Sequence, residues 1–175
     1  MSRITDFYMG QLNHPSGASI DAIWHWDNGQ LEYDHTYIQW LFPLPEVSAA
    51  VPGSPILMTK DIQRFNDSRE LTERLLKSFQ LMLGFYGFGL TSVPDALDQP
   101  KIVHTEAFAE RARNWLTTGN HNYLRITRIL RSMTLLGLAK EAREFFAVLQ
   151  RVYLKNADTI GLITYEYWRN AVRQK

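Results

Sequence analysis

The hydrophobic pattern centres on residues 37–42, where Tyr, Ile, Trp, Leu and Phe surround one polar residue, Gln39. Asp34, just upstream, is suited to accept hydrogen bonds from the N–H groups that begin a helix. Pro43 has no N–H and disfavours a helical residue before it, so this helix is expected to end near Phe42. A helix of about two turns that is apolar on nearly every side has to be buried. The sequence therefore predicts an aromatic helix at the centre of the core.

Most of the remaining chain repeats apolar residues at three- and four-residue spacing, which is typical of helices packed on a core. We expect these helices at about 19–26, 59–66, 68–86, 105–115, 121–136, 138–153 and 158–171. Asp27, Asn28 and Gly29 are interpreted as the end of the first of them. Thr105 and Asp158 are interpreted as N-caps.

Two Pro-containing stretches, 43–58 and 88–104, lack helical periodicity, and neither alternates like a strand for more than a few residues. We therefore predict an all-α fold in which residues 1–175 form a single compact globular domain. It should contain about seven or eight helices around the buried aromatic helix, with two long Pro-rich loops.

Charge and cysteine content narrow the functional classes. The 19 Lys and Arg residues balance 18 Asp and Glu residues, so no nucleic-acid partner is expected. Without cysteine there is no disulfide, thiol nucleophile or thiolate metal site. The N-terminal residues lack the apolar core of a signal peptide, and no apolar run reaches the ~18 residues of a membrane span. We expect a cytoplasmic protein with no transmembrane segment.

Motifs with known chemistry are missing from the sequence. No two of the five histidines stand four residues apart, so no helical metal site is indicated. The glycine-rich stretch 84–89 follows a helix and not a strand, which favours helix termination over phosphate binding. No Gly-x-Ser-x-Gly elbow occurs. We expect no metal, no cofactor and no catalytic residue, and favour a protein that is not an enzyme.

Two sets of polar residues are candidates for ligand binding. His35 and Gln39 stand one helical turn apart beside Trp40, and could hold a ligand or satisfy buried backbone groups. Asn120, at the start of a helix, precedes a second set in which His121, Arg125 and Arg128 follow at helical spacing. With the free N–H groups of the helix start, this set could bind a carboxylate or phosphate. The alternative is a solvated basic face, or a buried Arg125 that ties helices together.

Three stretches carry a family resemblance: residues 37–44 preceded by His35, residues 79–87, and residues 120–132 followed by Leu136-Gly137-Leu138. Their order and spacing resemble the conserved domain of the opioid growth factor receptor family. The resemblance implies an all-α domain. In animals the named member of that family is a receptor for the peptide Met-enkephalin, associated with nuclear sites and with restraint of growth. This chain has no basic nuclear-import cluster and no C-terminal repeats, so we expect a stand-alone, microbial member. The resemblance supplies no binding-residue motif.

The resemblance and the missing catalytic motifs favour a binding domain that recognises a peptide or an anionic small ligand. Its groove would be lined by Trp40, Phe42, Trp115 and the Arg125/Arg128 face. One alternative is an enzyme that uses His35 and His121 with Arg125 or Arg128. Another is a structural or oligomerising helical protein with an apolar patch around Tyr165 and Trp168. The sequence identifies neither the ligand nor the physiological role.

Overall fold

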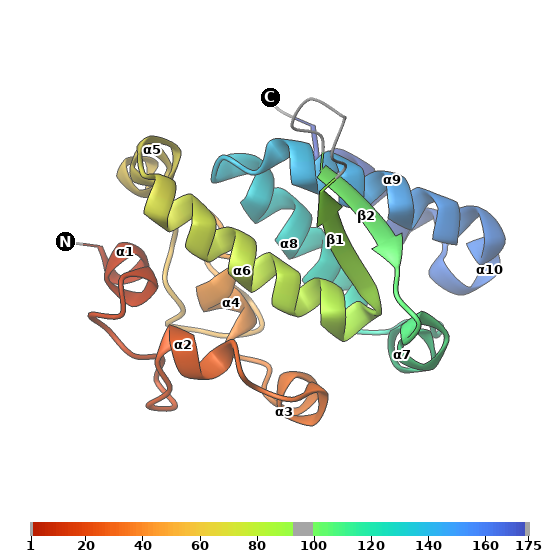
Figure 1. Ribbon diagram of the computed structural model, residues 1–175, viewed down its shortest axis with the longest axis horizontal. Helices are drawn as coiled ribbons and strands as arrows, with labels where there is room; N and C mark the ends of the chain where they lie inside the picture. Colours follow the sequence, from red (N-terminus) through yellow and green to blue (C-terminus); the bar gives the residue numbers. More distant parts are fainter. Residues whose placement is uncertain (1, 93–99, 174–175) are drawn as a thin grey trace. The chain divides into compact units, whose positions relative to one another are not determined.

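The all-α prediction is confirmed. The computed structural model describes residues 2–92 and 100–173, in which eleven helices and one two-stranded sheet are found (Figure 1). Helices make up 61% of the structure. The chain divides into two compact units, Met1–Leu81 and Met82–Lys175. None of the helices in the described ranges combines the length and apolar character that a membrane crossing requires.

The first unit begins with short helices. Their bounds are α1 Arg3–Tyr8, α2 Ile20–Ile23, α3 Asn28–Tyr33 and α4 Ile38–Leu41. Ser19 caps α2 as predicted, by accepting from the N–H of Ala22. Helix α3 was not predicted. Asp27, which we interpreted as the end of a helix, is instead the N-cap of α3 and forms a capping box with Gln30.

Helix α4 has only one turn, which is shorter than predicted, but its burial is confirmed. Tyr37, Trp40 and Phe42 are all at most 2% exposed. The Asp34 carboxylate accepts from the N–H groups of Thr36 and Tyr37, but it does so in the turn before the helix. Asp34 is the C-cap of α3, and the N-cap of α4 is Tyr37, which makes no side-chain capping bond, so the predicted cap is wrong. The helix ends before Phe42 and Pro43, where the sequence placed its end. Its side chains pack against α1, since Phe7 meets Trp40 with the ring centroids 5.2 Å apart.

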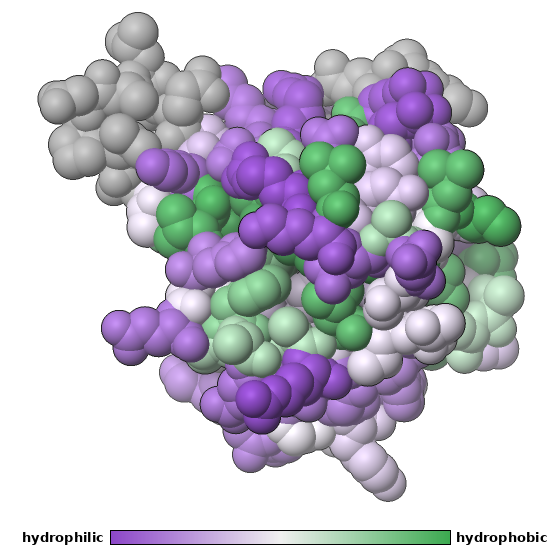
Figure 2. All heavy atoms as spheres, turned by 90° about the vertical axis from the view of Figure 1, so that its right-hand side faces the viewer, coloured by the Kyte–Doolittle hydropathy of each residue, from purple (hydrophilic) through white to green (hydrophobic). Residues whose placement is uncertain are grey.

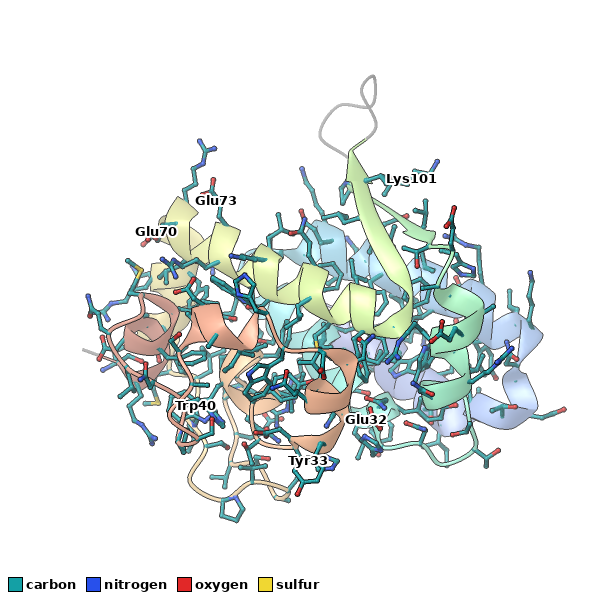
Figure 3. All side chains as sticks on the ribbon, turned by 60° about the horizontal axis from the view of Figure 1, so that its bottom comes forward. Glu32, Tyr33, Trp40, Glu70, Glu73 and Lys101 are labelled. Carbon is teal, nitrogen blue, oxygen red and sulfur yellow. The ribbon has the colours of Figure 1, made fainter. Side chains whose placement is uncertain are left out.

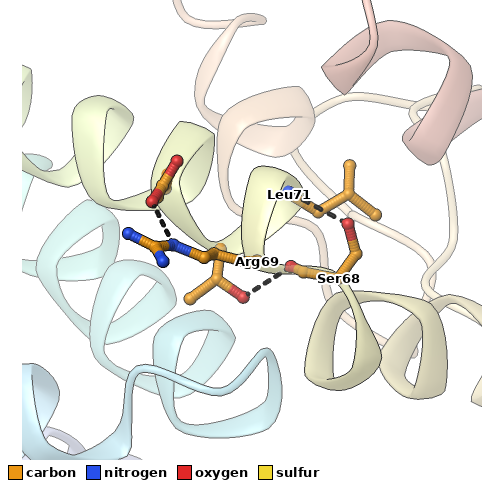
Figure 4. A network of polar contacts seen from close by, with 5 residues as sticks. Ser68, Arg69 and Leu71 are labelled. Atoms are coloured by element: carbon orange, nitrogen blue, oxygen red, sulfur yellow. Dashed lines mark hydrogen bonds and ion pairs between the residues drawn. The ribbon is translucent and has the colours of Figure 1, made fainter.

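Two longer helices follow, α5 (Thr59–Asp67) and α6 (Arg69–Tyr86), both close to their predicted bounds. Ser68 separates them, and its side chain makes the change of direction possible. The Ser68 hydroxyl accepts from the N–H of Leu71, and its carbonyl accepts from the Thr72 hydroxyl (Figure 4). The first of these bonds gives an acceptor to a free N–H of the first turn of α6, and the second ties the Thr72 side chain to the same turn.

The second unit contains the one clear departure from the predicted loops. Strands β1 (Phe88–Ser92) and β2 (Pro100–His104) form an antiparallel hairpin inside the stretch that we predicted to be a loop. Strand β2 packs on α9 (Ala139–Lys155), so a helix covers this small sheet. Ile102 and Val103 are adjacent apolar residues in β2, which breaks the period-two alternation that indicates a strand in a sequence.

Helix α7 (Phe108–Trp115) begins later than predicted, because Thr105 is not its cap. The Thr105 hydroxyl donates instead to the carbonyl of Gly87 (2.9 Å). Arg111 and Trp115 of α7 donate to the carbonyls of Phe85 and Tyr86. Side chains of α7 thereby satisfy the last carbonyls of α6, which have no partner within that helix.

The remaining helices are α8 (Asn122–Leu135), α10 (Ala157–Ile160) and α11 (Leu162–Ala171). Helix α8 packs on α9 and α11, as the short connections predict. The single final helix that we predicted from Asp158 is broken. Gly161 adopts a φ of 79°, a left-handed conformation that ends α10 before α11 begins.

Trp40→Ala tests the central role of α4. Removing this buried ring should lower the free energy of unfolding by about 3–5 kcal/mol, because a cavity replaces a packed side chain. Urea denaturation measures the change. Tyr33, which is 88% exposed, is the matched aromatic control (both are labelled in Figure 3). A change for Trp40→Ala no larger than that for Tyr33→Ala would contradict the central role.

Gly87→Ala tests the close approach of α6 and α7. Gly87 has a φ of 87°, and a methyl group placed there would lie 2.6 Å from the Cα of Phe108. We expect a loss of about 2–4 kcal/mol in the free energy of unfolding, from backbone strain and overlap together. Gly84 is the control, because nothing lies within 4 Å of its added methyl group. Gly84→Ala should stabilise the helix by roughly 0.5–1 kcal/mol.

Candidate functional site

The second unit contains a pocket between β2 and α9, which we call the basic pocket. Its volume is about 560 Å³, a size typical of small-molecule sites. It is lined by residues of β2, α7 and α9: Lys101, Ile102, Val103, His104, Phe108, Val148, Arg151, Val152, Lys155 and Asn156. Ile102, Val148 and Val152 are buried and form an apolar floor. The pocket therefore combines apolar contact surface with charged groups at its edge.

The charged groups of the basic pocket are all cationic. Val148, Arg151, Val152 and Lys155 follow one another at helical spacing, so one stripe of α9 supplies both floor and charge. Lys101 comes from β2 (Figure 3). Among the residues that the structure describes, no carboxylate forms an ion pair with Lys101, Arg151 or Lys155. The nearby Glu144 instead accepts from the N–H of Ile102 (3.4 Å).

His104 forms one side of the basic pocket. Its ring stacks on Phe108 with the centroids 3.7 Å apart and the planes at 17°. The Phe88 ring lies beside this pair, with its centroid 5.3 Å from that of His104 and the planes tilted by 58°. Partial burial, and then the positive charges of Lys155 and Arg151, lower the pKa of His104 below its ordinary value. These effects favour the neutral imidazole at pH 7.

The surface around α9 and α10 mixes hydrophilic and hydrophobic residues, as the lining of the basic pocket does. Figure 2 shows this side of the molecule, with hydrophilic residues lying across hydrophobic ones. The sequence pattern did not indicate the basic pocket, for two reasons. Lys101 and His104 fall in the stretch predicted to be a loop, and the helix predicted at about 138–153 stops short of Lys155. The spacing 148, 151, 152 and 155 is the signal that could have found it.

The predicted binding residues of the first unit have structural partners. Gln39 is buried, and with its amide nitrogen turned toward the backbone it donates to the carbonyls of Thr36 (2.9 Å) and His35 (3.1 Å). This is the structural alternative that the sequence left open. Trp40 is packed by Phe7, with the Arg3 guanidinium 4.9 Å from its ring centroid. His35 is exposed. A ligand role for these residues stays a prediction.

The second predicted set lies in and beside α8. Asn120 donates to the Asn114 carbonyl (2.9 Å) and accepts from the N–H of Asn122 (3.0 Å), so it shapes the turn before this helix. Arg125 is buried and its guanidinium donates to the Asn122 side chain (3.4 Å). His121 is exposed and Arg128 is half-buried. Because the two predicted sets belong to different units, their convergence on one ligand also stays a prediction.

The aromatic residues proposed to line a ligand groove or a surface patch are buried. Trp40, Phe42 and Trp115, the predicted groove lining, are each at most 2% exposed. Trp168, expected in an apolar surface patch, is also buried, and its indole N–H donates to the Tyr123 carbonyl (3.1 Å). The large apolar side chains that α11 does expose are Leu162, Ile163 and Tyr167. Aromatic residues at helical spacing thus form the core here.

A polar network in the first unit links the chain before α2 to the start of α4. His14 is buried, and its Nδ1 accepts from the N–H of Ser16 (3.2 Å) and meets the Ser16 hydroxyl (2.8 Å). This assigns the ring proton to Nε2, which lies 3.1 Å from the Thr36 hydroxyl. Thr36 in turn donates to the Asp34 carboxylate (2.7 Å). Thr36 stands between the histidine and the carboxylate, so this is not the arrangement of a catalytic triad. The network instead ties the turn at Ser16 to the turn before α4.

No group of three or more His, Asp or Glu side chains in the described part of the chain is arranged to hold a metal ion.

With both units described, comparison with known proteins supplies the family. The chain matches the opioid growth factor receptor (OGFr) conserved region over residues 2–175. It belongs to the opioid growth factor receptor conserved-region family. It is 40% identical to the rat opioid growth factor receptor over 136 residues, which cover 75% of this chain and 22% of the relative. The predicted resemblance is confirmed.

Other members of this family show the same partial coverage. The human opioid growth factor receptor is 36% identical over 153 residues, 85% of this chain and 21% of the relative. The mouse opioid growth factor receptor-like protein 1 is 36% identical over 141 residues, 75% of this chain and 28% of the relative. The chain thus spans about a fifth to a quarter of the length of these relatives. No solved structure matches it.

The His14 network predicts how stability depends on pH. Burial lowers the pKa of His14, more than the charge of Asp34 raises it. The unfolded chain therefore binds a proton here more readily than the folded one. The contribution of the neutral His14 to the free energy of unfolding is complete above the ordinary histidine pKa of about 6.5. It is lost as the pH falls below that value, by at most about 1.4 kcal/mol per pH unit for one proton.

Urea denaturation at several pH values between 8 and 5 measures this loss. His14→Gln should reduce it, whereas His25→Gln, a change at an exposed histidine, should not. Equal pH dependence in the two variants would show that His14 is not responsible.

Proposed function

We propose that this chain is a ligand-binding domain, and that the basic pocket binds the anionic group of a peptide or a small molecule. The supporting observation is the set of cations over an apolar floor, with no ion-paired carboxylate among the described residues. A ligand that carries both an anionic group and an apolar group would complement this surface. The relatives' names support a binding role, because the rat and human proteins are called receptors.

Charge placement favours binding over catalysis at this pocket. Arg151 and Lys155 are exposed cations on neighbouring turns of one helix, suited to hold an anion by charge and hydrogen bonding. His104 is the only side chain in the pocket lining that titrates near neutral pH. A cytoplasmic location and the predicted binding residues His35, Gln39, Trp40, Asn120, His121, Arg125 and Arg128 stay separate proposals.

Titration calorimetry with a panel of short peptides and small organic acids tests the proposal. At least one anionic ligand should bind, and the double variant Arg151→Glu with Lys155→Glu should bind it about tenfold more weakly or worse, because attraction is replaced by repulsion. The matched control is Arg113→Glu with Arg143→Glu. It changes the net charge equally at exposed positions outside the basic pocket. Binding by no member of the panel, or equal weakening in both double variants, would refute the proposal.

A further inference from the structure

We propose that the basic pocket binds an oxyanion carried on an aromatic or similarly flat apolar group, and that His104 takes up a proton as this ligand binds. The inference rests on the proposed function, which it makes more specific. It concerns the chemical class of the ligand and the way in which pH controls its binding.

The apolar part of the ligand is indicated by the pocket's shape and lining. A volume of about 560 Å³ is much larger than an inorganic anion needs. The floor of Ile102, Val148 and Val152 offers no hydrogen-bonding side chain. The parallel rings of His104 and Phe108, 3.7 Å apart, present a flat wall against which a further ring can stack. The basic pocket therefore fits a flat apolar group beside the anion.

The position of the oxyanion is indicated by the groups around His104. Helix α9 contributes Arg151 and Lys155, whose charges act on the imidazole, and Glu144, which is held by the N–H of Ile102. Strand β2 contributes Lys101. Strand β1 and helix α7 contribute the uncharged rings of Phe88 and Phe108. An oxyanion between His104 and the two α9 cations would meet positive charge without displacing an ion-paired carboxylate of the described residues.

The same arrangement links binding to a proton. Partial burial and the charges of Lys155 and Arg151 lower the pKa of His104, which favours the neutral imidazole in the protein without ligand. A bound anion offsets the repulsion from both cations and accepts a hydrogen bond from a protonated ring, so it raises that pKa again. The complex then binds more protons than the empty site does. By linkage, affinity rises as the pH falls through the range in which free histidine titrates.

Calorimetric titration with 1-naphthalenesulfonate tests the proposal, because its sulfonate stays ionised between pH 5 and 8 and any pH dependence belongs to the protein. Binding should be about three- to tenfold tighter at pH 5.5 than at pH 7.5. His104→Gln should remove this difference, and His25→Gln should keep it. Histidine NMR of the wild type provides a readout that needs no variant: the titration midpoint of His104 should move to higher pH when the probe is present.

The outcomes separate this inference from the proposed function. Equal affinity at both pH values, or an unmoved His104 midpoint, would refute proton uptake while leaving the binding function intact. Failure of the probe to bind, while other anions of the panel do bind, would refute the ligand class alone. If neither the probe nor any panel member binds, both proposals fail.

A second set of titrations distinguishes two sources of such an oxyanion, the C-terminus of a peptide and a free aromatic acid. Acetyl-Gly-Phe and 1-naphthoate represent them, and the tighter ligand identifies the source. The amide of acetyl-Gly-Phe should bind about tenfold more weakly than its acid, because it carries no charge. Equal binding of acid and amide would overturn the role of the oxyanion.

Discussion

A one-turn helix surrounded by apolar side chains can be buried only if the backbone groups at its ends, and in the turn before it, find hydrogen-bond partners. In the first unit this constraint determines the roles of residues from several segments. The Asp34 carboxylate accepts from the N–H groups before α4, and the Gln39 amide serves the carbonyls of His35 and Thr36. The hydroxyl of Tyr8, at the end of α1, donates to the Leu41 carbonyl of α4. The polar residues around Trp40 are thus the condition under which the aromatic residues can be buried.

The second unit meets the same constraint at the end of α6. Gly87 turns the chain in a left-handed conformation, and the carbonyls just before it would be left without partners in the interior. The guanidinium of Arg111 and the indole N–H of Trp115 supply donors at 2.8 and 3.0 Å. Gly87, Arg111 and Trp115 therefore act together to end α6. The end of α6 determines where the β1–β2 hairpin begins, and β2 forms one wall of the basic pocket.

The sequence predicted those parts of the fold that depend on local pattern. Apolar spacing gave α5, α6, α8 and α9 nearly to their ends, and Pro43 located the end of α4. It failed where local signals compete: Asp27 can follow one helix or begin the next, and only the structure shows that it begins α3. The sequence pattern did not reveal the basic pocket, because the pocket forms only where β2 packs against α9. The residues of these two elements lie about 50 positions apart in the sequence. Gln39 and Asn120 were predicted to bind a ligand because they are polar residues beside aromatic residues or at a helix start. In the structure their side chains form hydrogen bonds with backbone groups, as buried polar side chains commonly do.

The carboxylate of Glu144 has a consequence for the hairpin itself. In an antiparallel ladder, alternate residues direct their N–H and carbonyl groups away from the partner strand, so the outer edge of β2 presents the groups that attract a further strand. Ile102 is one of these residues, and its N–H is already bonded to Glu144 from α9. A strand from another molecule would have to displace a charged acceptor and the packed helix that carries it. Glu144 and α9 thereby hinder intermolecular extension at the β2 edge of the sheet, the first step of aggregation through that edge.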